Sequence, residues 1–272
     1  MERSTLKSWR SPAVPAKVAN PPDDDLSGRT IIGIPLDSPR RLTSLVLDQT
    51  DDGQAGERTL KQNLFKVRLA DTDGRRNRAS ILVKKMYAWR GYKVAWHARQ
   101  QANRVTLVAS HGDLPMATIS VSFDSSAGLL VDELYKPEVD ELRGAGKRVC
   151  EFTKLAVDGA SRSKRVLATL FHIAYIYSYR MNNYSDLFIE VNPRHVRFYE
   201  QMLGFRQLGP VRQNARVDAP AVLLRLDFTH SETQIAIFGG HPDKSRTEKS
   251  LYPYFFSPTE EHGISTRLSK LG

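Results

Sequence analysis

Cysteine is almost absent from this 272-residue chain, which contains only Cys150. A single thiol excludes an internal disulfide framework and any thiol-rich metal site, and a reducing cytoplasm is the expected location. Cys150 lies in a stretch that reads as a strand, where a buried and unreactive thiol is the usual case. His97 and His111 have no companion residue at ligand spacing, so we expect no metal site.

Long apolar runs are also missing from the sequence. No stretch approaches the roughly 20 apolar residues that are needed to span a bilayer. The first residues also lack the apolar segment that marks a signal peptide. We therefore expect a protein that is neither exported by that route nor embedded in a membrane.

Acidic residues are scarce relative to basic ones. The chain has 30 Asp and Glu residues against 40 Lys and Arg residues, which gives a net charge of +10. Such a surplus implies an acidic partner, either nucleic acid, an anionic membrane or an acidic protein. The basic residues gather at predicted helix starts and at the termini, and no stacking platform or base-reading helix is evident. A basic nucleic-acid-binding module is therefore the weaker interpretation of the positive charge, and we expect no nucleic acid partner.

Composition divides the chain into three parts. Residues 1–60 mix prolines, an acidic run and scattered arginines with few apolar residues, so we expect a largely disordered N-terminal leader. Residues 61–229 carry the periodic apolar patterns of a folded domain. Residues 230–272 show no strong period, so we expect an irregular C-terminal extension that is packed locally or frayed.

The folded domain begins with a strand and a helix. Residues 64–71 alternate as a strand, and Asp73 is the expected cap of the helix that follows. Four apolar residues are expected to form the inner face of this helix: Ile81, Leu82, Met86 and Trp89.

A hairpin and an inserted segment come next. Residues 104–112 and 115–124 read as two antiparallel strands, and Gly112-Asp113 supplies the turn. Residues 129–147 then separate this hairpin from the next strand, with a short helix expected around Pro137–Arg143.

The stretch from residue 148 to residue 205 has the order strand, turn, helix, strand, helix. An apolar strand pattern is followed by the basic turn SRSKR and then by a helical pattern over 166–180. A second strand, DLFIEV, leads into Asn192-Pro193, which is a good cap and first-turn pair for the next helix. This order predicts two parallel strands joined by a crossover helix.

This order resembles the central motifs of the GNAT acyltransferase superfamily. The resemblance lies in the strand Phe152–Asp158, the basic helix start after it, and the spacing of Asn192, Tyr199 and Gly204-Phe205. It implies an α/β (α+β) protein with the GNAT fold, in which helices flank a mixed central sheet with a splayed parallel strand pair.

Three longer runs look like one family within that superfamily. Residues 132–158, 163–178 and 192–205 resemble the long-chain N-acyl amino acid synthases of the FeeM type, which are related to the acyl-homoserine lactone synthases. The resemblance covers roughly residues 65–228. It implies an N-acyltransferase that moves a fatty acyl chain from acyl carrier protein to the amino group of an amino acid.

The same resemblance implies how the acyl donor binds. The backbone of Leu155, Ala156 and Val157 would hold the pantetheine arm, and the following helix start would take its phosphate. Four residues make up that helix start: Arg162, Ser163, Lys164 and Arg165. Asn192 commonly contacts the arm in the superfamily, although capping its own helix would also explain it. No tightly bound cofactor is expected, because acyl-4'-phosphopantetheine acts as a co-substrate.

Glycine is missing where GNAT enzymes that use coenzyme A usually have it. Arg165 and Leu167 stand at the positions of the two glycines that let backbone N–H groups close on a pyrophosphate. Side chains there would crowd a pyrophosphate but leave room for one phosphodiester. This departure favours a carrier-protein thioester, and a GNAT acyltransferase that uses acyl-coenzyme A and a small amine is the alternative.

Candidate catalytic residues follow from the same alignment of motifs. Glu151 is the candidate general base, with a raised pKa near an apolar tunnel, or else a structural glutamate. Tyr199 is the candidate acid that protonates the leaving thiolate, or else a buried tyrosine. Asp132 and Glu133 are candidate partners for the acceptor ammonium, or else they serve their own helix N-terminus.

Any membrane association of the protein is expected to be peripheral and to involve the product only.

Overall fold

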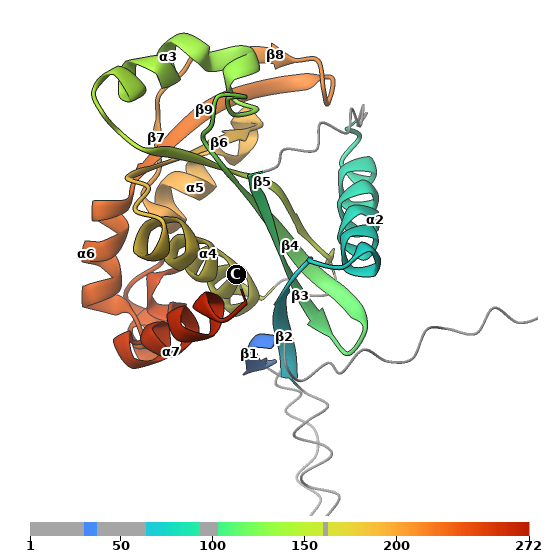
Figure 1. The fold of residues 1–272 in the computed structure, drawn as a ribbon, viewed down its shortest axis with the longest axis vertical. Helices are drawn as coiled ribbons and strands as arrows, with labels where there is room; N and C mark the ends of the chain where they lie inside the picture. Colours follow the sequence, from blue (N-terminus) through green and yellow to red (C-terminus); the bar gives the residue numbers. More distant parts are fainter. Residues whose placement is uncertain (1–29, 37–63, 93–102, 160–162, 272) are drawn as a thin grey trace, which may run out of the picture.

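The computed structural model describes residues 30–36, 64–92, 103–159 and 163–271 (Figure 1). Most of the expected leader and Arg162 lie outside the described residues. A nine-stranded sheet runs in the order β1-β2-β3-β4-β5-β6-β9-β7, and β8 pairs with β9. Its strands are β1 (Thr30–Pro35), β2 (Leu64–Leu69), β3 (Arg104–His111), β4 (Leu114–Phe123), β5 (Val149–Val157), β6 (Asp186–Val191), β7 (Arg206–Gln207), β8 (Arg212–Asn214) and β9 (Ala219–Asp227).

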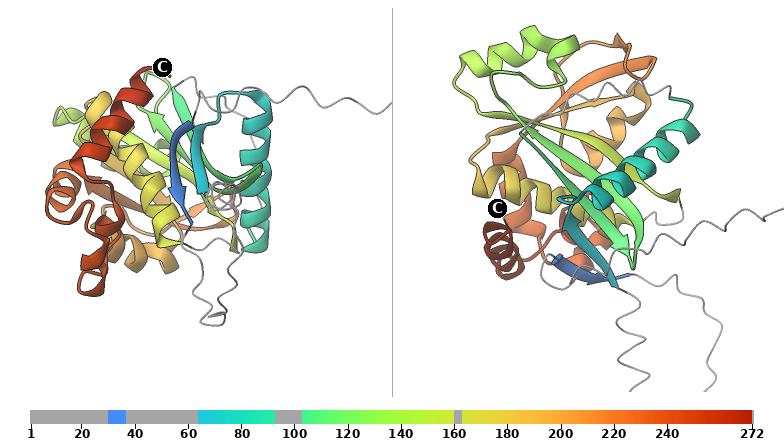
Figure 2. Two further views of the ribbon diagram at one scale, coloured as in Figure 1. Left: turned by 90° about the horizontal axis from the view of Figure 1, so that it is seen from below. Right: turned by 45° about the vertical axis from the view of Figure 1, so that its right-hand side comes forward.

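Helices cover both faces of this sheet, with α2 on one side and α4 on the other (Figures 1 and 2). The α-helices are α2 (Asp73–Trp89), α3 (Asp132–Gly144), α4 (Lys164–Tyr175), α5 (Val196–Leu203), α6 (Phe228–Phe238) and α7 (Pro258–Ser269). The shorter turns are η2 (Ile176–Met181), η3 (Pro193–His195), η4 (Pro242–Arg246) and η5 (Tyr252–Tyr254). None of the helices in the described ranges is long and apolar enough to cross a bilayer.

The central β5–α4–β6 unit matches the expected order. The apolar residues of α4 (Val166, Leu170, Ile173 and Ala174 among them) are buried in the main core. Each residue from Ala168 to Tyr175 is buried, because α4 contacts the sheet and also η5 of the C-terminal segment. The strands β5 and β6 are parallel, whereas each of the other strand pairs recorded in the sheet is antiparallel. The predicted mixed sheet with flanking helices is therefore confirmed.

The parallel pair separates soon after it begins. Register partners join β5 and β6 over only three positions, the last being Glu151 opposite Phe188. Beyond that point β5 stays with β4, while β6 continues beside β9. A bulge in β5 lies just past the separation, where Lys154 has a φ of 53° and the register with β4 shifts by one residue. The splay and the bulge together open a gap on one side of β5.

The C-terminal segment differs from its expected irregular state. It forms α6 and α7, and its residues Phe255, Ile264 and Leu268 are buried in the same core cluster as α4. Ser257 and Glu260 start α7 with a reciprocal capping box. The sequence showed no sustained period because the helices are short and two 3-10 turns interrupt the segment.

The N-terminal region also contains a strand that composition did not predict. Residues Thr30–Pro35 form β1, which pairs antiparallel with β2, and Ile31 is fully buried. Arg267 in α7 donates a hydrogen bond to the Ile31 carbonyl at 2.6 Å. The two ends of the described chain therefore lie side by side.

Two helices also differ in detail from the sequence-based expectation. Thr72, not Asp73, caps α2. Ile81 and Trp89 are 64% and 65% exposed, so they belong to the outer face of that helix. The inner face is formed instead by Ala79, Leu82, Val83 and Met86, which keep helical spacing among themselves.

Helix α3 starts earlier than expected. It begins at Asp132 and bends at Tyr135, two residues before Pro137, because proline cannot continue the backbone hydrogen bonds of a straight helix.

Candidate active site

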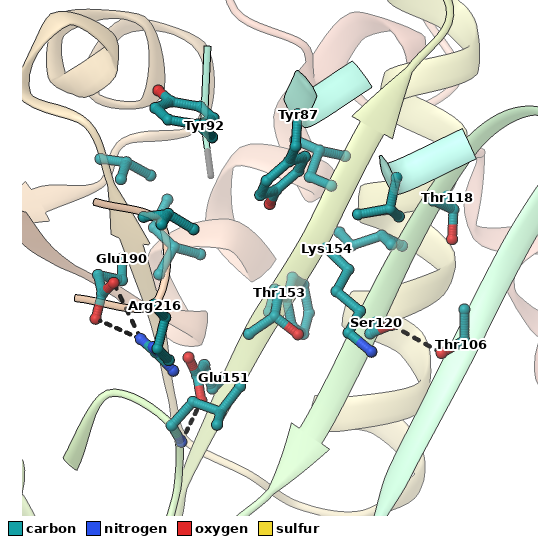
Figure 3. Close-up of a pocket in the computed structure, with 18 of the residues that line it drawn as sticks. Tyr87, Tyr92, Thr106, Thr118, Ser120, Glu151, Thr153, Lys154, Glu190 and Arg216 are labelled. Carbon is teal, nitrogen blue, oxygen red and sulfur yellow. Dashed lines mark hydrogen bonds and ion pairs between the residues drawn. The ribbon is translucent and has the colours of Figure 1, made fainter. Parts of the chain in front are cut away.

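A cavity of about 800 Å³ lies at the splay of β5 and β6 (Figure 3). Its walls come from α2, from the start of β3, the middle of β4 and the end of β6, from the bulged part of β5, and from the segment between β8 and β9. The cavity is wide enough for more than one small molecule, because pockets for drug-sized ligands start at about 300 Å³.

Polar side chains line the sheet face that borders this cavity. Residues opposite each other in neighbouring strands share a face, and the register places Arg104 beside Ser122 and Ser122 beside Glu151. The next row contains Thr106, Ser120 and Thr153. The other face of the same strands is apolar and packs against α4. Strand alternation therefore turns polar groups toward the cavity and apolar groups toward the core.

Glu151 is the most deeply buried carboxylate in the cavity wall, with 1% of its surface exposed. The backbone N–H of Leu130 donates a hydrogen bond to its Oε2 at 2.8 Å. Burial, and secondarily the negative charge of Glu190, raises the pKa of Glu151 to about 8. A carboxyl group with a pKa near the working pH is suited to take up and release a proton.

Glu190 and Arg216 form an ion pair on one side of Glu151 (Figure 3). Arg216 Nη2 lies 3.0 and 3.1 Å from the two carboxylate oxygens, and the amide of Asn214 also donates to Glu190. Burial still raises the pKa of Glu190, although Arg216 opposes this effect. Sequence reasoning missed the pair. The sequence did contain a signal for Glu190. It is an acidic residue near the end of β6, the strand that separates from its parallel neighbour β5.

Arg104 and Lys154 lie on the other side of Glu151, and both line the cavity. Burial, followed by the positive charge of Arg104, lowers the pKa of Lys154 to about 8. Burial also lowers the pKa of Arg104, whose Nε donates to the Ser122 hydroxyl at 3.1 Å. Sequence reasoning missed Arg104 and Lys154 as site residues. The alternation of β3 and β4 would have placed Arg104 on the polar face of the sheet.

The predicted acyl-donor segment of β5 is only partly in the cavity. Leu155 lines it, whereas Ala156 is buried against α2. Val157 is half-buried and packs at the edge of the main core. Asn192 lines the cavity, and its Oδ1 accepts a hydrogen bond from the Arg194 N–H at 3.2 Å. Asn192 therefore caps η3 and faces the cavity at the same time.

The predicted phosphate site is at the start of α4. The Ser163 hydroxyl accepts hydrogen bonds from the backbone N–H groups of Arg165 and Val166, at 3.2 and 3.4 Å, so it caps the helix. Lys164 is exposed and Arg165 is half-buried. None of these three predicted residues is part of the cavity wall, and the fourth, Arg162, lies outside the described residues.

Tyr199 lines the cavity from α5. Its ring packs edge-on against Phe171 and Phe205, with ring centroids 6.5 and 5.8 Å apart. Burial raises its pKa above the usual value. The phenol therefore keeps its proton at neutral pH and can act as a hydrogen-bond donor.

Asp132 and Glu133, the two candidate acceptor-binding residues, lie outside the cavity wall. Asp132 accepts from the Leu129 N–H at 2.7 Å and pairs with Arg143 at 2.9 Å, so its carboxylate serves the start of α3. Glu133 reaches the cavity indirectly, because its Oε2 lies 3.3 Å from Nε of Arg216.

Comparisons with known proteins agree with this architecture. The family model of the N-acyl amino acid synthase FeeM matches residues 78–227, more than half of the chain. The structure of FeeM, an N-acyl amino acid synthase from uncultured soil microbes, is 28% identical with a TM-score of 0.59, and the match covers 64% of this chain and 98% of FeeM. No curated protein sequence matches the chain.

Two further solved structures show weaker similarity. A putative N-acetyltransferase from Lactobacillus plantarum is 16% identical with a TM-score of 0.46, and the match covers 60% of this chain and 97% of that protein. The acyl-homoserine lactone synthase LasI is 14% identical with a TM-score of 0.42, and that match covers 60% and 89% of the two chains. Because the family model matches more than half of this chain, the chain belongs to the FeeM family of N-acyl amino acid synthases and is an acyltransferase with the GNAT fold.

Proposed function

We propose that this enzyme transfers a fatty acyl chain from the thioester of an acyl carrier protein to the amino group of an amino acid. The observation that carries the proposal is the position of Glu151, a buried carboxyl group with a pKa of about 8, in the wall of a large cavity at the β5–β6 splay. Family membership supports the reaction class, and the missing turn glycines at Arg165 and Leu167 support the carrier-bound donor.

The pantetheine arm would enter the gap beside β5. Beyond Glu151 the edge of β5 that faces β6 has no register partner in β6, so its backbone can pair with the amide groups of the arm. The thioester carbonyl would then lie near Glu151, Leu155 and Asn192, which line the same cavity.

The chemical step would be aminolysis. Glu151 takes a proton from the acceptor ammonium, and the amine nitrogen attacks the thioester carbonyl carbon. The C–N bond forms, the C–S bond breaks, and the thiolate receives a proton from the Tyr199 hydroxyl or from water. The acyl nitrogen releases its second proton, which restores the Tyr199 hydroxyl directly or through water, and Glu151 returns its own proton to solvent. The products are an N-acyl amino acid and the free carrier thiol. Holding both reactants in one cavity supplies much of the rate gain.

The test is a donor comparison on the purified enzyme. The acyl-carrier-protein thioester and the coenzyme A thioester of the same chain are each offered with the twenty standard L-amino acids, and products are identified by mass spectrometry. We expect N-acyl amino acids, with a much larger kcat/KM for the carrier-bound donor. Equal kcat/KM values for the two donors would refute the carrier assignment. Acylation of small amines alone from coenzyme A would establish the alternative acyltransferase.

A further inference from the structure

The cavity reaches the apolar side of the sheet at the point where β5 and β6 separate. The two strands are last paired at Glu151 and Phe188. The next residue on each strand, Phe152 and Ile189, lines the cavity, although both belong to the same core cluster as α4. Because successive side chains of a strand point to opposite faces, Phe152 lies on the other side of the sheet from Glu151. The cavity therefore passes from the polar face to the apolar face beside Glu151.

Phe171 lies at the apolar end of this passage. It belongs to α4, on the side of the sheet opposite to α2 (Figure 2), and within the described residues it is the one residue of α4 in the cavity wall. Its side chain is buried. The centroid of its ring lies 6.3 Å from that of Phe152 and 6.5 Å from that of Tyr199. The cavity thus ends at a group of three packed aromatic rings.

An acyl chain matches this apolar passage better than it matches the sheet face toward α2. That face carries polar side chains such as Arg104, Ser120 and Thr153, and covering such groups with hydrocarbon costs free energy. Against apolar side chains, in contrast, each buried methylene raises affinity by about fourfold. A chain that starts at the thioester near Glu151 can enter the passage directly between Phe152 and Ile189.

We infer that the acyl chain of the donor runs through the β5–β6 splay toward α4 and that Phe171 limits its length. The inference rests on the proposed function, because it takes a fatty acyl chain as the transferred group. Protein interiors are close-packed, so a chain that touches the Phe171 ring cannot be extended without displacing that ring. Phe171 is therefore a specificity-determining residue, and donors with chains longer than the passage should react poorly.

The test is a chain-length profile with acyl-carrier-protein thioesters from octanoyl to stearoyl and the amino acid that the wild-type enzyme uses best. Phe171→Leu removes three carbon atoms from the end of the passage. We expect the chain length with the largest kcat/KM to rise by about two carbons. The ratio of kcat/KM for that longer chain to kcat/KM for the wild-type optimum should rise by about 15-fold, the value of two newly buried methylenes.

A second variant tests the opposite direction. Phe171→Trp enlarges the side chain, so the optimum should move to shorter chains. This profile also decides the question if Phe171→Leu does not fold.

Phe228→Leu is the matched control. Phe228 is buried in α6 and its ring lies 6.5 Å from that of Phe152, but it does not line the cavity. The same substitution there should destabilise the fold to a similar degree and leave the chain-length profile as in wild type. Equal shifts of the profile in Phe171→Leu and Phe228→Leu would overturn the inference, and so would an unchanged profile in both Phe171 variants.

A binding measurement separates this inference from the proposed reaction. Thermal-shift titrations use free fatty acids of the same chain lengths, without donor or acceptor, because a ligand that binds the folded state raises its Tm. An optimum that moves to longer chains in Phe171→Leu alone, without turnover from any acyl donor, would refute the reaction and support the passage. Turnover with the same optimum in every variant would support the reaction and overturn the passage.

Discussion

At the scale of single residues, the site depends on what burial does to Glu151. An exposed glutamate has a pKa near 4.3 and is a weak base at neutral pH. The same group at 1% exposure, with the charge of Glu190 nearby, has a pKa of about 8. Its contact with the Leu130 N–H fixes the orientation of the carboxyl group. The position of Glu151 on β5 thus places its carboxyl group in the cavity wall, and burial sets its proton affinity.

Replacing Glu151 with Gln should separate catalysis from structure. The amide keeps the size of the side chain and can still accept from the Leu130 N–H, but it cannot take a proton. We expect turnover to fall by about 10²–10⁴-fold, the usual contribution of one positioned base. The loss should shrink above about pH 8, where Glu151 is already ionised and a further rise in pH only deprotonates the acceptor amine in solvent. Steady-state rates between pH 6 and pH 9 measure this.

Glu141→Gln provides the control for that experiment, because Glu141 is an exposed acid on α3. Its turnover should match wild type at every pH. An active but thermally destabilised Glu151→Gln enzyme would show that Glu151 is structural.

The raised pKa of Glu151 also predicts how stability changes with pH. The folded state keeps the Glu151 proton up to about pH 8, whereas the unfolded chain releases it near its ordinary pKa. The folded state therefore binds more protons in this window, and the free energy of unfolding falls as pH rises, by up to about 1.4 kcal/mol per pH unit. The Glu151→Gln substitution removes the titrating group and therefore this decrease in the free energy of unfolding. The Tm of the variant minus that of wild type should increase from pH 5 to pH 8, and a constant difference would contradict the assigned pKa.

At the scale of elements, the C-terminal helix α7 is fixed to α4 by a buried histidine. His172 is fully buried, and its Nδ1 accepts a hydrogen bond from the Phe256 N–H at 2.8 Å. Its Nε2 lies 3.2 Å from Glu261 of α7. Burial lowers the pKa of His172, so the ring is neutral and its Nε2–H donates to the carboxylate. One side chain therefore links α4 to two points of the C-terminal segment, which are 84 and 89 positions away in the sequence.

Replacing His172 with Leu should destabilise this junction. The substitution keeps the site apolar but leaves the Phe256 N–H buried without its acceptor. We expect the free energy of unfolding to fall by about 1–3 kcal/mol, the usual cost of such a buried group. Urea denaturation measures this, with His262→Leu as the control, because His262 is an exposed histidine on α7, the other helix of the junction. Equal stability of the two variants would show that the junction contributes little.

At the scale of the whole molecule, the net charge of +10 should guide association with an acidic carrier protein. The start of α4 is the expected docking point, because the pantetheine phosphate would bind there. Arg194 of η3 and Arg197 of α5 are two further basic residues that we expect to contribute to docking. In the structure Arg194 contacts the hydroxyl of Tyr92 at 2.9 Å.

Reversing charges at the start of α4 tests this docking. Lys164→Glu combined with Arg165→Glu should raise KM for the acyl carrier protein by about tenfold at low salt, with little change in kcat. The KM of the variant should also depend less on salt than that of wild type. Lys270→Glu, an exposed cation near the end of α7, changes the net charge in the same direction and should have a much smaller effect. A double variant with unchanged KM and salt dependence would show that these charges only solvate the helix.

The sequence by itself determined the local elements and the family. The period of α4, the cap at Asn192 and the glycine turn of the β3–β4 hairpin are set by residues within a few positions of each other, so spacing predicts them. The order of these elements was enough to indicate the GNAT fold and the FeeM family. Glu151 was found in the same way, from its place at the start of a recognisable strand.

Only the tertiary structure decided which groups meet Glu151 in the cavity. Arg104 shares its row through two strand registers, Lys154 faces the cavity because of a bulge, and Arg216 pairs with Glu190 across 26 positions of sequence. The burial of α7 against α4 likewise depends on contacts such as His172 with Phe256, 84 positions apart. Such contacts depend on sheet register and packing, which local periodicity does not specify.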